Sequence, residues 1–125
     1  MKPHAHRNEL ARLLYATRNS LKGYVRVWRD EAAFRSQVLA LIGLLPLAAW
    51  LARDWTQFGL LVSAWLLVLA AELGNSAIEA AVDRIGMEHH DLTGKAKDAG
   101  SAMVMTAMII AGLVWAGMLV DRLLA

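Results

Sequence analysis

The sequence predicts an all-α integral membrane protein, organised as a single membrane domain over residues 1–125. The first observation is composition: 58% of the 125 residues are hydrophobic, 19% are charged and the mean hydropathy is +0.41, which is too apolar for an ordinary small soluble domain. The second is that residues 36–52, 55–71 and 99–120 contain no charged side chain. The third is an excess of Lys and Arg in the polar N-terminal segment. Together these observations predict three transmembrane helices.

The first expected element is an amphipathic surface helix over about residues 6–29. Apolar side chains recur there at helical spacing, while basic side chains gather on another face. The apolar set is Leu10, Leu13, Leu14, Thr17, Leu21, Tyr24 and Trp28, and the basic set is Arg12, Arg18, Lys22, Arg26 and Arg29. Such a helix can lie on an anionic leaflet. The alternative is a solvated basic face that only sets the orientation of the chain.

The three transmembrane helices are expected at about residues 34–52, 55–83 and 98–121. Because about 20 residues are needed to cross about 30 Å of hydrocarbon, the first two uncharged segments are short. Arg35 and Arg53 can snorkel, and the second helix can continue past Glu72 if its polar face meets protein rather than lipid. Pro46 predicts a kink in the first span. A soluble helical bundle is the alternative, because buried core helices reach similar lengths.

The distribution of charge predicts the orientation. Residues 1–35 carry eight of the 13 Lys and Arg residues, whereas the turn between the first two spans carries only Arg53. The N-terminus and the loop before the third span are therefore expected on the cytoplasmic side. Trp50 and Trp55 flank that turn and fit an aromatic belt on the opposite side. Because apolar spans accompany the basic residues, anionic lipid or a nucleotide is expected as partner rather than nucleic acid.

A polar stripe lies inside or just beyond the second apolar segment. At about 100° per residue, Glu72, Asn75, Glu79 and Asp83 fall within roughly 80° of one helix face. A carboxylate at membrane depth costs about 2.5 to 3.5 kcal/mol on insertion scales, so such a stripe indicates binding of a cation, a proton or a phosphate. The alternative is that these polar groups only hold helices together.

The positions of the acidic residues suggest separate tasks. Glu31 precedes the first span, so Glu31 and Glu79 can share a Mg²⁺ ion if the helix ends pack together, because Mg²⁺ takes one or two carboxylates. Glu72 lies deeper in the apolar run and is a candidate general base. Asn75 can orient either neighbour by hydrogen bonding.

The loop before the third span supplies basic charge. Lys97 lies near the expected helix start, where unpaired backbone N–H groups also attract a polyphosphate. His89 and His90 suggest a metal site, but adjacent residues do not share a helix face, so ordinary loop residues are the alternative. The absence of cysteine from the sequence excludes thiol nucleophiles and zinc sites with Cys ligands. The sequence has no Walker A motif and no protein-kinase signature, so any nucleotide chemistry uses another architecture.

Three stretches match a known family: ELGNSAIEAAVDR at residues 72–84, AKDAGSA at 96–102 and DEAAFR at 30–35. They resemble the small prokaryotic diacylglycerol kinases, and the resemblance covers roughly residues 8–122. It implies a homotrimer with active sites shared between neighbouring subunits, in the bacterial inner membrane, with the N-terminus cytoplasmic and the C-terminus periplasmic. Two positions depart from the family pattern: Gly74 replaces a large aliphatic residue, and Gln37 replaces an acidic one.

The resemblance also implies residue roles. Glu72 would be the base acting on the lipid hydroxyl, Asn75, Lys97 and Asp98 would be further catalytic residues, and Asp83 would support the site. The Mg²⁺ ligands would be Glu31 and Glu79. The residues at the nucleotide would be Arg12, Asn19, Glu31, Glu79, Glu88, His89, His90, Lys97 and Asp98. The residues at the lipid substrate would be Arg12, Phe34, Arg35, Trp50, Glu72 and Ser101.

The expected activity is transfer of the γ-phosphate of MgATP to the hydroxyl of diacylglycerol, which gives phosphatidic acid. One alternative is an undecaprenol kinase, which phosphorylates another lipid alcohol on the same fold. A second is a carrier of ions or protons without enzymatic activity, which could use the same acidic stripe. A third is a structural membrane adaptor, which would tolerate loss of the Glu72 carboxylate.

Overall fold

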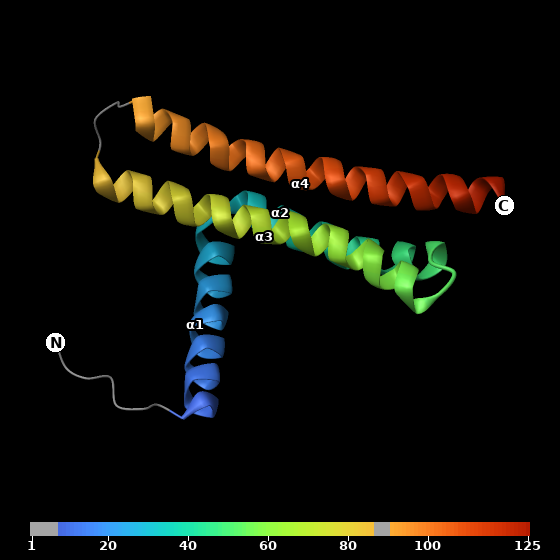
Figure 1. Ribbon diagram of the computed structural model, residues 1–125, viewed down its shortest axis with the longest axis horizontal. Coiled ribbons are helices and arrows are strands. Elements are labelled where there is room, and N and C mark those ends of the chain that lie inside the picture. Colours follow the sequence, from blue (N-terminus) through green and yellow to red (C-terminus); the bar gives the residue numbers. More distant parts are fainter. Residues whose placement is uncertain (1–7, 87–90) are drawn as a thin grey trace.

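The computed structural model describes residues 8–86 and 91–125. Over these residues the chain forms four α-helices and no strand: α1 (Glu9–Asp30), α2 (Ala32–Leu51), α3 (Trp55–Ile85) and α4 (Asp91–Leu124) (Figure 1). The prediction of an all-helical protein is confirmed. Helices α2, α3 and α4 are each long and apolar enough to cross a membrane, in agreement with the three expected spans.

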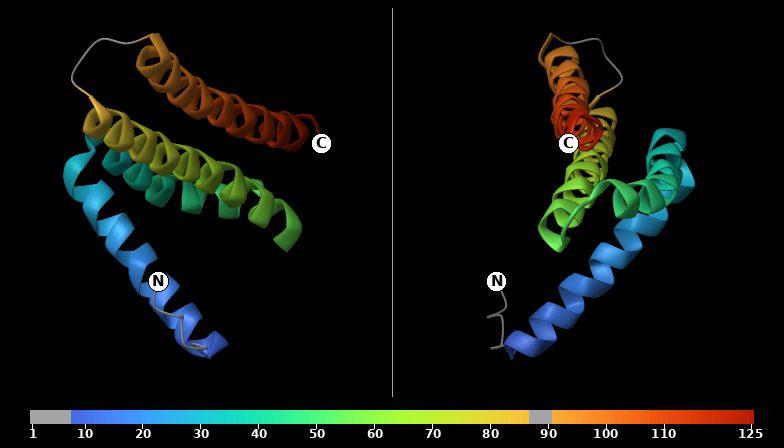
Figure 2. Two further views of the ribbon diagram at one scale, coloured as in Figure 1. Left: turned by 60° about the vertical axis from the view of Figure 1, so that its left-hand side comes forward. Right: turned by 90° about the vertical axis from the view of Figure 1, so that its right-hand side faces the viewer.

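Helices α2, α3 and α4 lie side by side as a bundle (Figures 1 and 2). Small side chains form the buried contact between α3 and α4: Ala64, Val68 and Ala71 on α3 with Ala107 and Ala111 on α4. Small residues allow two helices to approach closely, which is the usual basis of packing in a membrane, where lipid tails are as apolar as leucine.

The end of the bundle at the α2–α3 turn is fastened by polar contacts. Asp54 caps α3 by accepting a hydrogen bond from the backbone N–H of Gln57 at 2.8 Å. Arg53 donates to the backbone carbonyl of Asp121 at 3.0 Å, near the C-terminus of α4. The Arg122 guanidinium lies 4.9 Å from the centre of the Trp50 ring. These contacts tie α2, α3 and α4 together at that end.

Helix α1 projects away from the bundle instead of packing along it (Figures 1 and 2), and none of its residues is buried. Glu31 separates α1 from α2 in an extended conformation, with φ −119° and ψ 108°. The Arg35 guanidinium donates from Nη1 to the carbonyls of Trp28 at 2.7 Å and Arg29 at 3.1 Å. A cation at these last carbonyls stabilises the C-terminus of α1.

The helices of the bundle differ in length at its other end. At 1.5 Å per residue, α2 is about 30 Å long, while α3 and α4 reach about 46 and about 51 Å. The surplus lies beyond the α1–α2 junction, where the C-terminal end of α3 and the N-terminal end of α4 extend past the start of α2 (Figure 1). Pro46 lies inside α2, and the helix continues through it to Leu51. The polar stripe of α3 is therefore carried by the part of the helix near and beyond the junction.

Candidate active site

The site is built on the polar stripe of α3. Glu72, Asn75 and Glu79 are half-buried, whereas Asp83, one further turn along, is exposed. The Asn75 side-chain amide donates a hydrogen bond from Nδ2 to Glu79 Oε1 at 3.3 Å. The Asn75 Oδ1 atom is buried and is the one buried side-chain polar atom of the described residues that lacks a hydrogen-bond partner. Asn75 is thus connected to Glu79 through one end of its amide only.

The α1–α2 junction brings a third carboxylate to this stripe. Glu31 and Glu79 both lie close enough to Glu72 to act on its charge. Glu31 therefore lies near Glu72 within a single chain, and its role as a Mg²⁺ ligand with Glu79 stays a prediction. Because the Arg35 contacts hold the end of α1, they also hold the position of Glu31 between the two helices. Glu31 lies 41 positions before Glu72 in the sequence, so only the folded chain brings it near the α3 acids.

The acids suit a hard cation that arrives with its own oxygen ligands. Among residues 8–86 and 91–125, no three His, Cys, Asp or Glu side chains are arranged as a metal site. Mg²⁺ commonly binds one or two protein carboxylates and keeps water and phosphate oxygens in its other positions. Carboxylates that repel one another gain from a cation placed among them. Glu31 and Glu79 are therefore candidate ligands for a cation whose other ligands come from outside the chain.

Helix α4 contributes basic charge to the same end. Lys97 Nζ lies 2.7 Å from Asp83 Oδ1, with 45% and 64% of the two side chains exposed. Glu79 also attracts the Lys97 ammonium group. Because solvent screens such an exposed ion pair, its contribution to stability is small. Its main consequence is positional, since it keeps Lys97 near Glu79.

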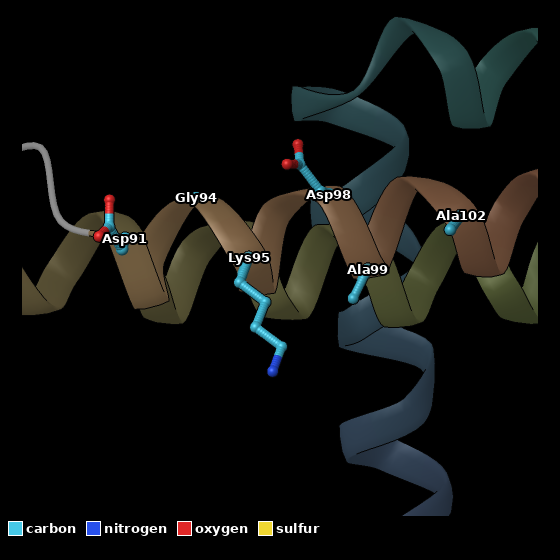
Figure 3. Close-up of a pocket in the computed structure, with 6 residues that line it drawn as sticks. All are labelled: Asp91, Gly94, Lys95, Asp98, Ala99 and Ala102. Carbon is cyan, nitrogen blue, oxygen red and sulfur yellow. The ribbon is translucent and has the colours of Figure 1, made fainter.

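Asp98 occupies a different surface. It lines an open groove of about 600 Å³ made by α4 alone, together with Asp91, Gly94, Lys95, Ala99 and Ala102. In Figure 3 the Asp98 side chain points to one edge of the helix and the Lys95 side chain to the other. Asp98 is exposed, and so is Ser101 one turn further on.

Several residues assigned by resemblance lie away from this group. Arg12 pairs with Glu9 at 2.8 Å on the first turn of α1, and Asn19 is exposed further along the same helix. Arg12 is 19 residues before Glu31, which is about 28 Å along a helix. Trp50 lies about as far from Glu31 in the other direction, at the α2–α3 end. A single chain does not bring these three residues to Glu72.

The remaining assigned residues have other environments. Phe34 is buried, with 3% of its surface exposed, so this chain itself covers its ring. Arg35 is engaged with the end of α1, a structural role that the sequence comparison with the family did not indicate. Glu88, His89 and His90 lie outside the described residues.

The two departures from the family pattern have identifiable surroundings. A Cβ atom at Gly74 would lie 3.0 Å from Cε of Met103, so the absence of a side chain leaves room for this methionine. The Gln37 carbonyl accepts a hydrogen bond from Trp65 Nε1 at 2.8 Å, which joins α2 to α3 through the backbone of residue 37.

Sequence reasoning did not identify Gly100 as a site residue. Gly100 is buried on α4, and a Cβ atom there would overlap Asn75 Oδ1. The only signal in the sequence was its position inside the AKDAGSA stretch. No periodicity or charge pattern on α4 indicates which residue of α3 it faces.

Comparison with known proteins identifies the family. Residues 18–119 match the family model described as prokaryotic diacylglycerol kinase. A diacylglycerol kinase of Haemophilus influenzae is 44% identical over 110 residues, covering 88% of this chain and 93% of the relative. One from Escherichia coli K12 is 46% identical over 104 residues, covering 83% and 85%. One from Pseudomonas aeruginosa is 44% identical over 110 residues, covering 88% and 89%. This chain therefore belongs to the prokaryotic diacylglycerol kinase family.

Proposed function

We propose that this protein is an ATP-dependent diacylglycerol kinase, which transfers the γ-phosphate of ATP to the free hydroxyl of diacylglycerol and releases ADP and phosphatidic acid. The observation that carries the proposal is the half-buried Glu72 carboxylate beside the α1–α2 junction, with Glu31 and Glu79 close enough to act on its charge. Membership of the family and the names of the three relatives support the same reaction.

Glu72 acts as the general base. It lies within α3, a candidate membrane span, on the bilayer side of Glu79, where the hydroxyl of a membrane lipid can reach it. Its carboxylate accepts the proton of that hydroxyl while the hydroxyl oxygen attacks the γ-phosphorus. The bond from the γ-phosphorus to the bridging oxygen breaks, and this oxygen leaves with ADP. General-base assistance of this kind contributes about 100-fold to 10,000-fold in rate.

Glu31 and Glu79 hold Mg²⁺, with Asn75 orienting Glu79 through the Nδ2 hydrogen bond. When bound, Mg²⁺ neutralises charge on the phosphate oxygens. Glu79 is two helical turns from Glu72, about 10 Å along α3. The phosphates are therefore recognised at Glu79 and the lipid hydroxyl at Glu72 on the same face of α3. Of the two, the phosphates lie nearer the C-terminal end of this helix.

Lys97 stabilises the negative charge of the nucleotide. Asp83 keeps the Lys97 ammonium group on the side of α3 that carries Glu79. A cation that already lies near the reacting phosphate need not be reoriented when the transition state forms, so it stabilises the developing charge at little energetic cost. Asp98 is proposed as a further catalytic residue on the strength of its place beside Lys97 in the sequence.

The protein is proposed to act as a homotrimer in which neighbouring subunits complete each site. The support is that Arg12 and Asn19 lie on α1, far along that helix from Glu31, and that α1 buries none of its residues within the chain. A neighbouring subunit can bring these side chains to the nucleotide. Glu88, His89 and His90 belong to the same nucleotide proposal.

Helix α1 is proposed to lie on the cytoplasmic surface of the bacterial inner membrane, with the C-terminus of α4 on the periplasmic side. Helix α1 leaves the bundle at a large angle (Figures 1 and 2) and exposes large apolar side chains, including Leu14 at 62% and Leu21 at 60%. An interfacial helix buries such side chains at the boundary between headgroups and acyl chains. The basic residues of the N-terminal segment favour the cytoplasmic side.

The proposed reaction is tested with purified protein in detergent micelles, labelled ATP and Mg²⁺, offered diacylglycerol, undecaprenol or no lipid. We expect labelled phosphatidic acid with diacylglycerol and no labelled lipid in the third reaction. Phosphorylation of undecaprenol with no product from diacylglycerol would overturn the substrate assignment. A protein that consumes no ATP with either lipid, while moving ions across a vesicle membrane, would overturn the kinase assignment altogether.

A further inference from the structure

Gly100 lies at an unusual point of contact between α3 and α4. The face of α4 that packs on α3 carries buried small residues at three positions, Gly100, Ala107 and Ala111. The two alanines meet small apolar side chains of α3. Gly100 instead meets the polar stripe, since a Cβ atom there would overlap Asn75 Oδ1 and lie 3.4 Å from Asn75 Cγ.

The side chain that Gly100 accommodates is the one that contacts Glu79. Oδ1 and Nδ2 of Asn75 are both bonded to Cγ in one rigid planar amide, so neither atom can move without the other. Nδ2 donates to Glu79 Oε1 at 3.3 Å, while the buried Oδ1 has no hydrogen-bond partner. A side chain at residue 100 would push on the unpartnered end of the amide and displace the end that holds Glu79.

We expect a side chain at residue 100 to displace the Asn75 side chain without moving α3 and α4 apart. The other atom near the same Cβ position is Cδ1 of Ile78 at 3.6 Å, which is ordinary van der Waals contact. The overlap is therefore with the end of a short side chain and not with backbone, so Asn75 can turn aside while the two helices stay in place. Alanine is also favoured over glycine inside a helix.

We propose that Gly100 is a positioning residue for the phosphoryl-transfer site: the absence of a side chain on α4 lets the Asn75 amide lie against this helix and orient Glu79. The inference deepens the proposed function and rests on it. Gly100 contacts no substrate in this account. Its effect reaches the reaction through Asn75 and then through the carboxylate assigned to Mg²⁺.

The test compares Gly100→Ala with Gly112→Ala. Both glycines lie inside α4, but a Cβ atom at Gly112 would have no atom within 4 Å among those of the described chain. For Gly100→Ala we expect the half-saturating Mg²⁺ concentration to rise at least fivefold and kcat to fall at least tenfold, with the KM for diacylglycerol changed less than twofold. For Gly112→Ala, the half-saturating Mg²⁺ concentration, kcat and the KM for diacylglycerol should all stay within twofold of the values for the parent protein. A Mg²⁺ titration of Gly100→Ala that matches the one for Gly112→Ala would overturn the proposal.

A second measurement needs no activity and covers the case in which Gly100→Ala folds poorly. The Tm of the purified protein is measured for Gly100→Ala alone and for Gly100→Ala combined with Asn75→Ala. Alone, the substitution should lower the Tm, because Asn75 must move. In the Asn75→Ala background the overlap is gone, so the same substitution should leave the Tm unchanged or raise it. An equal fall in Tm in both backgrounds would show that Gly100 is needed only for helix packing and would overturn the proposal.

The kinetic comparison and the Tm comparison together distinguish failure of the positioning role of Gly100 from failure of the proposed function. If the parent protein fails to phosphorylate diacylglycerol, the proposed function fails, while the Tm comparison still tests the contact between Gly100 and Asn75. If the parent protein is active and Gly100→Ala behaves like Gly112→Ala, the proposed function stands and the positioning role is wrong.

Discussion

The polar groups at the two ends of the helical bundle differ in how far they are paired. At the α2–α3 turn, Asp54 caps a helix, Arg53 donates to a carbonyl of α4 and Arg122 lies over an aromatic ring. At the other end, Lys97 pairs with Asp83, but Glu31 and Glu79 both repel the charge of Glu72, and a buried amide oxygen has no partner among the described residues. Polar groups that are paired stabilise a fold, whereas unpaired ones persist where they serve binding or catalysis. The difference indicates that one end fastens the bundle and the other performs the chemistry.

The largest effect is expected from Glu72→Gln, which removes the proton acceptor and keeps the shape of the side chain. Lipid phosphorylation should fall by about 100-fold or more, the scale of general-base assistance. The rate is measured in micelles with saturating MgATP and diacylglycerol. Asp121→Asn is the matched control, because it neutralises an exposed carboxylate at the opposite end of the bundle and keeps the backbone carbonyl that accepts a hydrogen bond from Arg53. The comparison between the two ends fails if both substitutions have the same effect.

Glu79→Gln should have the next largest effect and a different signature. Loss of one carboxylate from the proposed Mg²⁺ ligands should raise the half-saturating Mg²⁺ concentration by about tenfold, which corresponds to about 1.4 kcal/mol of binding free energy. The KM for diacylglycerol should change little, because the lipid hydroxyl is assigned to Glu72. The measurement is a Mg²⁺ titration at fixed ATP and lipid. An unchanged titration curve would count against a ligand role for Glu79.

Arg35→Ala should have an intermediate effect that joins stability and activity. It removes two hydrogen bonds from a cation to the last carbonyls of α1, which is expected to lower the free energy of unfolding by about 1 kcal/mol. Because these contacts also hold Glu31, activity should fall several-fold even at temperatures where the protein stays folded. Thermal unfolding and the Mg²⁺ titration are measured on the same preparation. Arg35→Lys keeps the positive charge and should recover part of both losses.

Arg122→Ala should have the smallest effect and should leave catalysis unchanged. Loss of the cation–π contact with Trp50 is expected to lower the free energy of unfolding by about 0.5 to 1 kcal/mol. The rate of lipid phosphorylation below the unfolding temperature should match that of the parent protein. A large loss of activity without loss of stability would show that the far end takes part in the reaction, contrary to the division between the two ends.

Much of the architecture could be predicted from composition. Long uncharged segments require helices in a membrane, because every backbone polar group must be satisfied within the segment. The three candidate spans follow from that rule, whereas α1 follows from the helical spacing of its apolar side chains. A break between the first two helices was expected between residues 29 and 34, but its position at Glu31 was not, because no proline or glycine marks it and Arg35 stabilises it from the following helix. Local sequence patterns do not report a contact that reaches back across a junction.

The site was predictable in part for the same reason. The stripe on α3 follows from helical spacing alone, whereas the proximity of Glu31 to Glu72 depends on how the chain folds. The contact of Gly100 with Asn75 was not predictable, because it depends on the register between α3 and α4. Arg12, Asn19 and Trp50 came from family resemblance, and a single chain leaves them far from Glu72. Their roles remain proposals that depend on neighbouring subunits or on the lipid.

Glu72 is proposed to take part in the phosphoryl-transfer step and not in nucleotide binding. The most direct measurement is a single-turnover reaction of Glu72→Gln with labelled ATP, Mg²⁺ and diacylglycerol, combined with a binding titration of a non-transferable ATP analogue on the same sample. We predict binding of the Mg²⁺-bound analogue within about threefold of the parent protein and a transfer rate lower by about 100-fold or more. A folded Glu72→Gln protein that transfers phosphate at close to the parent rate would contradict the account.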